Sequence, residues 1–201
     1  MADDERHART RAERFAALFE AHYPRILGYA RRRASDEDAA DIAAETFSVA
    51  WRRFEDVPAG DAALLWLYGS ARRVLWNLRR SQERQQRLGD RARTQGADAA
   101  VDALEYVFGD TAHPHVAMVF SRLGPDDQEL LGLMAWEELT VAEIAATLGC
   151  SRNAARIRIH RARRRFAYEL ERLDGQADGS PDSSGRISPS PRVERLELER
   201  N

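Results

Sequence analysis

The residues with the clearest chemical potential are arginines gathered in one short stretch of the chain. Residues 151–165, SRNAARIRIHRARRR, contain seven arginines and no acidic residue. No carboxylate stands at i,i+4 spacing to neutralise them, so a helix here would carry an uncompensated cationic face. Guanidinium groups hold phosphates and guanine edges through paired hydrogen bonds. Such a face is typical of a nucleic-acid surface, and the alternative is an ordinary solvated helix face.

Two helices separated by a tight turn are predicted to position these arginines. Thr140, followed three residues later by Glu143, has the capping-box pattern that begins a helix. Gly149 suits the left-handed residue that ends this helix, and Ser151 suits the N-cap of the next one. The second helix has one apolar stripe, which consists of Ala155, Ile159, Ala162, Phe166 and Leu170. Together these features predict a helix-turn-helix, a motif that places its second helix in the DNA major groove.

The side chains opposite that stripe form the predicted DNA-reading face. At about 100° per residue, they point away from the core of the motif. With Arg152 at the start of the helix, the set is Arg152, Asn153, Arg156, Ile157, His160, Arg161 and Arg164.

Charge is segregated along the chain and nearly balanced overall. The 201 residues carry a net charge of −2, and all 31 basic residues are arginine. Residues 72–93 hold eight arginines against two acids, whereas residues 36–45 are acidic. This asymmetry indicates one surface for nucleic acid and another for a different partner.

Two further segments have binding chemistry. Asp41 and Glu45 lie at i,i+4, where like charges weaken an isolated helix slightly and a basic partner would relieve the repulsion. The alternatives are a solvated acidic face or ion pairs to Arg52 and Arg53. A later helix combines arginines with Trp66, Tyr68 and Trp76. Aromatic faces stack on unpaired bases while cations follow phosphates. The alternative, favoured for Trp66, is that the tryptophans belong to the core.

The sequence has no pattern of an enzyme, a metal site or a membrane protein. Its five histidines lack metal-ligand spacing, and there is no phosphate loop, GxSxG or glycine-rich dinucleotide turn. The single cysteine, Cys150, has no second cysteine with which to form a disulfide or a zinc site. No apolar run approaches the roughly 18 residues of a membrane span, and the N-terminus lacks a signal-peptide core. We expect a cytoplasmic protein with no catalytic residue, metal, cofactor or membrane insertion.

Helical periodicity without strand alternation predicts an all-α fold of two helical domains joined by a flexible linker. The second domain ends in the helix-turn-helix. The first domain is expected over residues 11–88, the linker over 89–114, the second domain over 115–173 and a disordered tail over 174–201. Pro24 is expected to bend or interrupt the first helix, Ser35 to cap the second, and Asp126 or Asp127 to cap the helix that precedes the motif.

Three stretches resemble the extracytoplasmic-function group of bacterial sigma factors. They are residues 38–51 (DAADIAAETFSVAW), residues 66–80 (WLYGSARRVLWNLRR), and LGPDDQELL at 123–131 followed by the motif at 140–165. Their order and spacing make the likeness specific. The chain departs from the family at Ala44, where Gln is common, and at Arg73, where Asn is common.

The resemblance implies partners and residue roles. Asp41, Glu45 and Phe47 would bind core RNA polymerase. Arg72, Arg73, Asn77 and Arg80 would contact the −10 element while the strands open, and the outward face described above would read the −35 element. Promoter DNA and core polymerase are the implied partners, with an anti-sigma factor as a further one. The other classes are a helix-turn-helix repressor or activator that acts without polymerase, and a sigma-binding antagonist. Neither needs both the acidic helix and the arginine-aromatic helix.

Overall fold

The structure, a computed structural model, describes residues 2–89 and 114–177, which form helices with no strand among them. The first unit contains α1 (Ala2–Arg31), α2 (Asp36–Arg52), the short 3₁₀ helix η1 (Phe54–Asp56) and α3 (Ala62–Gly89). The second unit contains α5 (Pro114–Arg122), α6 (Pro125–Ala135), α7 (Val141–Leu148) and α8 (Arg152–Ala177). The expected all-α fold with a terminal helix-turn-helix is confirmed. The predictions made for residues 90–113 and 178–201 lie outside the described residues.

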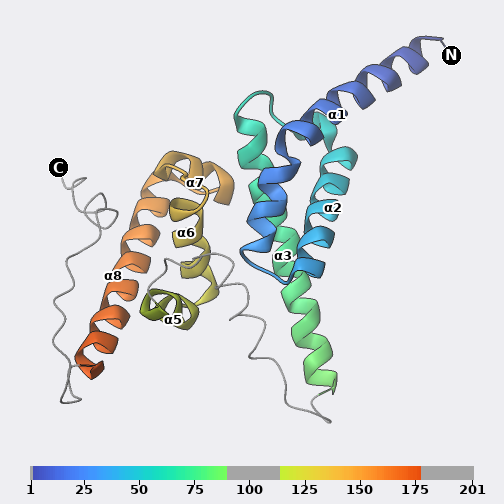
Figure 1. Ribbon diagram of the computed structural model, residues 1–201. Coiled ribbons are helices and arrows are strands. Elements are labelled where there is room, and N and C mark those ends of the chain that lie inside the picture. Colours follow the sequence, from blue (N-terminus) through green and yellow to red (C-terminus); the bar gives the residue numbers. More distant parts are fainter. Residues whose placement is uncertain (1, 90–113, 178–201) are drawn as a thin grey trace.

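The first unit is a three-helix bundle from which the N-terminal part of α1 projects (Figure 1). Ser35 caps α2 as expected, because its hydroxyl accepts a hydrogen bond from the Asp38 amide at 3.2 Å. The apolar faces of the three helices meet at residues such as Ile42, Ala43 and Leu67, which are at most 1 % exposed. Burial of this shared face stabilises the bundle and fixes the opposite faces of α2 and α3 toward solvent or toward the second unit.

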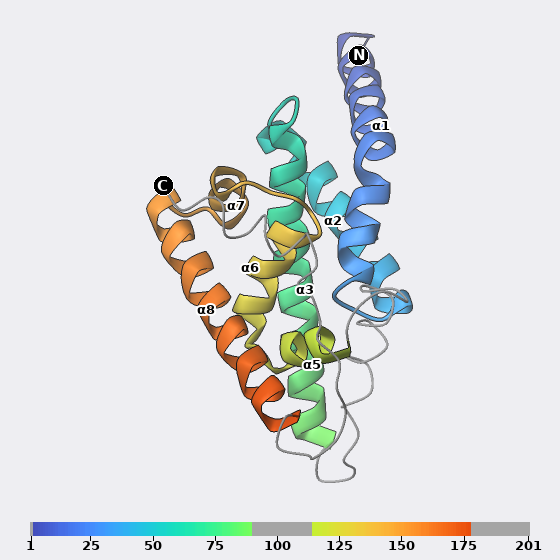
Figure 2. The same cartoon turned by 60° about the vertical axis from the view of Figure 1, so that its left-hand side comes forward.

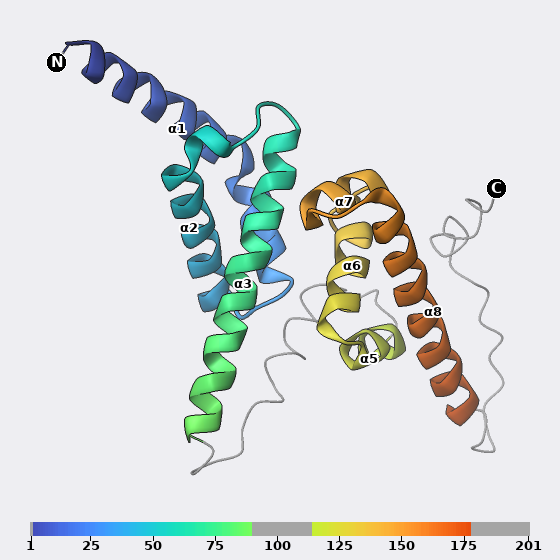
Figure 3. The same cartoon turned by 180° about the vertical axis from the view of Figure 1, so that it is seen from behind.

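The second unit packs against α3. Its last helix, α8, lies on the side away from the first unit and is called the recognition helix below. Figures 1 and 3 show α6 and α7 between α3 and α8, and Figure 2 shows the same order from another side. Buried residues of both units form one continuous apolar core, with Tyr29 and Tyr68 from the first unit and Leu133 and Ile144 from the second. The two units are therefore packed together in this structure.

Three details of the helices can be compared with the sequence expectations. Of the two outcomes expected at Pro24, an interruption does not occur, because Ile26, Tyr29 and Ala30 on its C-terminal side are fully buried and hold the helix in place. Helix α6 is capped by Gly124, and neither Asp126 nor Asp127 is the cap. The reason is that Pro125 occupies the first helical position, where its missing N–H costs nothing. Helix α1 begins at Ala2 and helix α8 ends at Ala177, so both extend beyond the expected domain ranges of 11–88 and 115–173.

Candidate nucleic-acid interface

The turn between α7 and α8 is built as the sequence predicts. The Thr140 amide donates to Glu143 Oε2 at 2.8 Å, and the Glu143 amide donates to Thr140 Oγ1 at 3.3 Å, which completes the capping box. Gly149 ends α7 in the left-handed region with φ 63°, a conformation that favours glycine. The hydroxyl of Ser151 accepts from the Ala154 amide at 3.1 Å and so caps α8. These local bonds fix the angle at which α8 leaves the turn.

Removing the capping box by Thr140→Ala should lower the free energy of unfolding by about 1 kcal/mol at pH 7. Hydrogen bonds from the Thr140 hydroxyl and amide lower the pKa of the Glu143 carboxyl. A carboxyl whose pKa is lowered on folding contributes stability above its unfolded pKa of about 4.3 and loses it as the pH falls through the folded value. The difference between urea melts of the two proteins should therefore become smaller in acid, while the part due to the bond from the Glu143 amide to Thr140 Oγ1 remains. An unchanged difference at low pH would contradict this account.

The buried and outward faces of α8 are those that the periodicity predicts. Ala155, Ile159 and Ala162 are 0–4 % exposed and lie against the core. The predicted reading set lies opposite and is exposed throughout: Arg152, Asn153, Arg156, Ile157, His160, Arg161 and Arg164. Among the described residues, no ion pair or hydrogen bond engages the arginine side chains of this set. Their full donor capacity is available to a ligand.

Two other arginines of the stretch 151–165 have structural partners. Arg165 donates two hydrogen bonds, from Nε and Nη2, to the Asp127 carboxylate of α6. Arg163 contacts the Sδ atom of Met134. Both side chains hold α8 against α6, so only part of the cationic stretch is presented outward.

Helix α3 divides its predicted −10 residues between solvent and the second unit. Arg73, Asn77 and Arg80 are exposed. Arg72 is half-buried, and its Nη2 atom lies 3.3 Å from Asp126 Oδ1 at the start of α6. Trp76 is 41 % exposed, whereas Trp66 packs against the core as expected. The structure thus brings Arg73, Asn77 and Arg80 to one open surface and shields Arg72.

Helix α2 presents an acidic outer face over an aromatic cluster. Asp41 and Glu45 are exposed, and Arg52 Nη2 donates to Glu45 Oε1 at 2.7 Å. The ion-pair alternative thus applies to Glu45. Phe47 is 3 % exposed and packs against Phe19, with ring centroids 4.8 Å apart. Phe47 therefore packs in the core beneath the acidic face of α2. Its exposed area is too small for direct contact with a partner.

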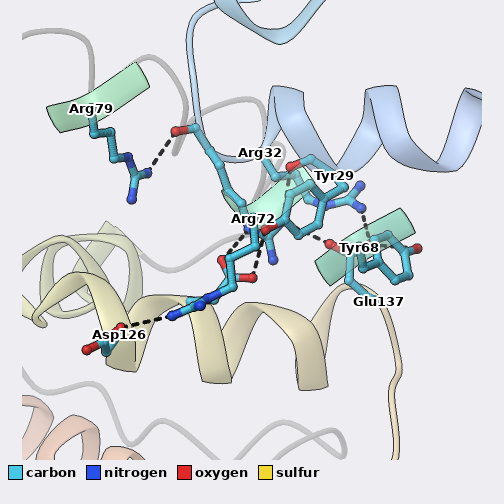
Figure 4. A network of polar contacts seen from close by, with 9 residues as sticks. Tyr29, Arg32, Tyr68, Arg72, Arg79, Asp126 and Glu137 are labelled. Atoms are coloured by element: carbon cyan, nitrogen blue, oxygen red, sulfur yellow. Dashed lines mark hydrogen bonds and ion pairs between the residues drawn. The ribbon is translucent and has the colours of Figure 1, made fainter. Parts of the chain in front are cut away.

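A network of buried polar groups joins the two units, and Figure 4 shows it from close by. Arg33 Nε donates to Glu129 at 2.8 Å, and Arg33 Nη1 donates to Glu137 at 2.9 Å. The Tyr29 hydroxyl donates to Glu129 at 2.8 Å, and Arg32 Nη2 donates to Glu137 at 2.5 Å. The side chains of Arg33, Glu129 and Glu137 are 5 %, 10 % and 2 % exposed. Such burial of charge is tolerated only with this degree of pairing.

Neighbouring groups keep Arg33 charged and Tyr29 protonated. Burial acts to lower the pKa of Arg33, but Glu129, Tyr29 and Glu137 raise it above its usual value, so the guanidinium stays charged. Burial and the neighbouring Glu129 raise the pKa of Tyr29 well above its usual value. Its hydroxyl therefore remains a donor at neutral pH.

Sequence reasoning did not find this network. Its partners are separated by about a hundred residues, so no local pattern links them. The only local signal is that Glu129 and Glu137 flank an apolar run, LLGLMAW, where buried neighbours are expected. An acid at such a place indicates a buried partner of opposite charge.

Residues 2–89 and 114–177 contain no group of three or more His, Cys, Asp or Glu side chains placed to hold a metal ion. Among the described helices, none combines the length and apolarity needed to cross a bilayer.

The helix-turn-helix of the second unit, with its free cationic face, is joined to the helical first unit and defines the chain as a DNA-binding protein. The family described as "Sigma-70 region 2" matches residues 18–85, and "Sigma-70, region 4" matches residues 116–166. RNA polymerase sigma-E factor of Streptomyces avermitilis is 29 % identical over 150 residues, covering 74 % of this chain and 80 % of the relative. The factor of the same name from Streptomyces antibioticus is 30 % identical over 137 residues, covering 68 % and 73 %.

Solved structures share the fold. The sigma factor RpoE, solved with the anti-sigma factor NepR from Bartonella quintana, superposes with a TM-score of 0.60 at 19 % identity, covering 79 % of this chain and 98 % of that one. CnrH, solved with the cytosolic domain of CnrY, gives a TM-score of 0.55 at 23 % identity, covering 78 % and 87 %.

The chain belongs to the extracytoplasmic-function group of RNA polymerase sigma factors. It directs promoter-specific transcription initiation, and the comparisons favour this function over a repressor or activator that acts without polymerase. Sigma factors are non-catalytic DNA-recognition proteins, in agreement with the absence of enzyme motifs from the sequence.

Proposed function

We propose that three surfaces of this sigma factor have separate roles in transcription initiation. The outward face of α8 reads the −35 duplex, the exposed side of α3 contacts the −10 element, and the acidic face of α2 binds core RNA polymerase. The observation that carries the proposal is the free cationic face of α8, whose arginines lack protein partners in the described part of the chain. A helix of this kind fits the major groove and satisfies its donors on base edges and phosphates.

The −10 assignment rests on Arg73, Asn77 and Arg80, with Arg72 joining them when its side chain is free. Exposed cations beside the exposed indole of Trp76 suit a single strand, because the ring stacks on a base while guanidinium groups hold phosphates. We further propose that residues 11–88 and 115–173 act as the two functional modules. The protein works in the cytoplasm, with polymerase, and an anti-sigma factor of the kind solved with RpoE is a further partner.

Run-off transcription with core RNA polymerase tests the proposal. The purified chain should direct initiation from a promoter selected by sequencing its transcripts, and base changes in the −35 or −10 element should each reduce the product. A chain that binds DNA but gives no transcript with core polymerase would favour the repressor alternative.

Arg164 lies toward the end of the reading set, where a phosphate contact is expected more than a base contact. Arg164→Ala should weaken −35 binding equally for all sequences and reduce the slope of log affinity against log salt by about 1. Titrations of labelled duplexes at several salt concentrations measure both quantities. A selective loss on one sequence, with an unchanged slope, would assign Arg164 to a base instead.

A further inference from the structure

The reading set on α8 contains one side chain that cannot form a hydrogen bond. This side chain is Ile157, which is 42 % exposed. All other members of the set carry hydrogen-bond donors. A single exposed apolar side chain is ordinary on a protein surface. Ile157, however, stands in the middle of the set, with Asn153 and Arg161 one helical turn away on either side. Its position within the reading face therefore indicates a role in binding.

The packing of α8 determines the direction in which Ile157 points. At about 100° per residue, Ile157 lies about 200° around the helix from both Ala155 and Ile159. Those two side chains are 0 % and 4 % exposed and lie in the core. Ile157 therefore points almost directly away from the core. It also lies near the N-terminal end of α8, the part of a recognition helix that meets base edges.

The edges of the bases in the major groove offer one apolar group, the 5-methyl group of thymine. The other groups that distinguish the base pairs are hydrogen-bond donors and acceptors. Contact with isoleucine would remove water from such a polar group and supply no hydrogen bond in return, which is unfavourable. A methyl group loses no hydrogen bond and gains from burial. 5-Methylcytosine carries the same methyl group at the same ring position, whereas uracil and cytosine lack it.

We infer that Ile157 binds the 5-methyl group of one pyrimidine in the −35 duplex, supplied by thymine or by 5-methylcytosine. The inference rests on the proposed −35 role of α8 and adds an apolar determinant to the arginine contacts. The polar members of the set hold the helix on the duplex, and Ile157 makes the affinity depend on a single methyl group. A promoter with cytosine at this position is then bound more tightly when that cytosine is methylated.

Deoxyuridine substitution tests the contact, because it deletes the methyl group and keeps the base pair with its hydrogen-bonding edge. Each thymine of the −35 duplex found by transcript sequencing is replaced in turn, and binding of the full-length chain is measured by fluorescence anisotropy. One replacement should weaken binding about fourfold, which corresponds to about 0.8 kcal/mol. Ile157→Ala should bind the thymine duplex more weakly and show no difference between thymine and uracil at that position.

Met118→Ala is the matched control, because Met118 on α5 is 44 % exposed in the same unit and lies outside the reading set. This control should keep the difference between thymine and uracil. Ile157→Ala opens no core cavity, since the side chain is exposed, and alanine favours a helix more than isoleucine does. The fold should therefore be retained. The slope of log affinity against log salt should also stay unchanged, because no phosphate contact is lost.

A comparison of methylated and unmethylated cytosine distinguishes the two sources of the methyl group. At the sensitive position, the thymine–adenine pair is replaced by a pair of guanine with either cytosine or 5-methylcytosine. The wild-type chain should bind the 5-methylcytosine duplex about fourfold more tightly than the cytosine duplex. Ile157→Ala should bind both equally. Equal binding of both duplexes by the wild-type chain would overturn 5-methylcytosine as a ligand.

The methyl contact and the proposed function fail in different ways. The contact is overturned if the wild-type chain prefers the cognate −35 duplex to a scrambled one but responds to no deoxyuridine, or if Ile157→Ala keeps the response. The −35 role of α8 then stands. Equal binding of the cognate and scrambled duplexes by the wild-type chain would instead overturn the −35 role itself, and the methyl contact with it.

Discussion

Replacing Asp41 and Glu45 together by arginine should abolish binding of the chain to core RNA polymerase, with at least a hundredfold loss of affinity, or about 2.7 kcal/mol. Both side chains are exposed on α2, so the substitutions create no cavity and bury no charge. The ion pair from Arg52 to Glu45 is itself exposed on both sides, and such pairs contribute about 0–1 kcal/mol. The fold should therefore remain intact while the sign of the surface reverses.

The measurement is a pull-down or fluorescence titration with core polymerase, accompanied by circular dichroism. Glu20→Arg with Glu171→Arg is the matched control, because it makes the same change in net charge on α1 and α8 at exposed positions. This control also separates a local effect from the general increase in affinity for DNA that added positive charge brings. Wild-type retention of polymerase by the α2 variant would place the polymerase-binding surface on another part of the chain.

The second large effect is expected at Arg156 on the recognition helix. Arg156→Ala should weaken binding to the cognate −35 duplex by about 1–3 kcal/mol and relax the preference at one base pair. The side chain is exposed and has no partner within the described residues, so its loss removes a ligand contact and no internal bond. Arg156→Lys should lose most of the discrimination as well, because an ammonium group cannot make the paired guanine contact.

Arg165 on the same helix provides the comparison. It is tied to Asp127 by two hydrogen bonds, so Arg165→Ala should lower the melting temperature and leave base preference unchanged. Binding of duplexes with every single substitution in the −35 element distinguishes the two outcomes. Equal profiles for wild type and Arg156→Ala would remove Arg156 from the base-reading set.

Local patterns in the sequence predicted the parts of the structure that local interactions determine. The capping box at Thr140, the left-handed Gly149 and the stripe containing Ile159 are each set within a few residues, and the structure confirms all three. The outward face of α8 follows from the same periodicity. The start of α6 was predicted wrongly because two acids suggested a cap, whereas the proline before them set the first helical position.

Contacts between distant segments explain what the sequence could not reveal. Whether Arg72 is free or held depends on where the second unit lies, and that is decided by pairs such as Arg33 with Glu129. Nothing near Arg33 in the sequence identifies its partner. Phe47 illustrates the same limit, because family resemblance points to it as a contact while the packing of α1 against α2 buries it.

The buried network also bears on how sigma factors of this kind can be recombined. Arg32 and Arg33 directly follow α1 in the first unit, while Glu129 and Glu137 come from the second. Consider a hybrid whose second unit comes from a relative with apolar residues at the positions of Glu129 and Glu137. It would keep both promoter-reading surfaces, but its two units would no longer have complementary charges where they meet. Arg33 would then face apolar side chains without a counter-charge, and the two units would remain separated. Exchanging promoter preference between such proteins therefore requires that Arg32 and Arg33 come from the same protein as Glu129 and Glu137.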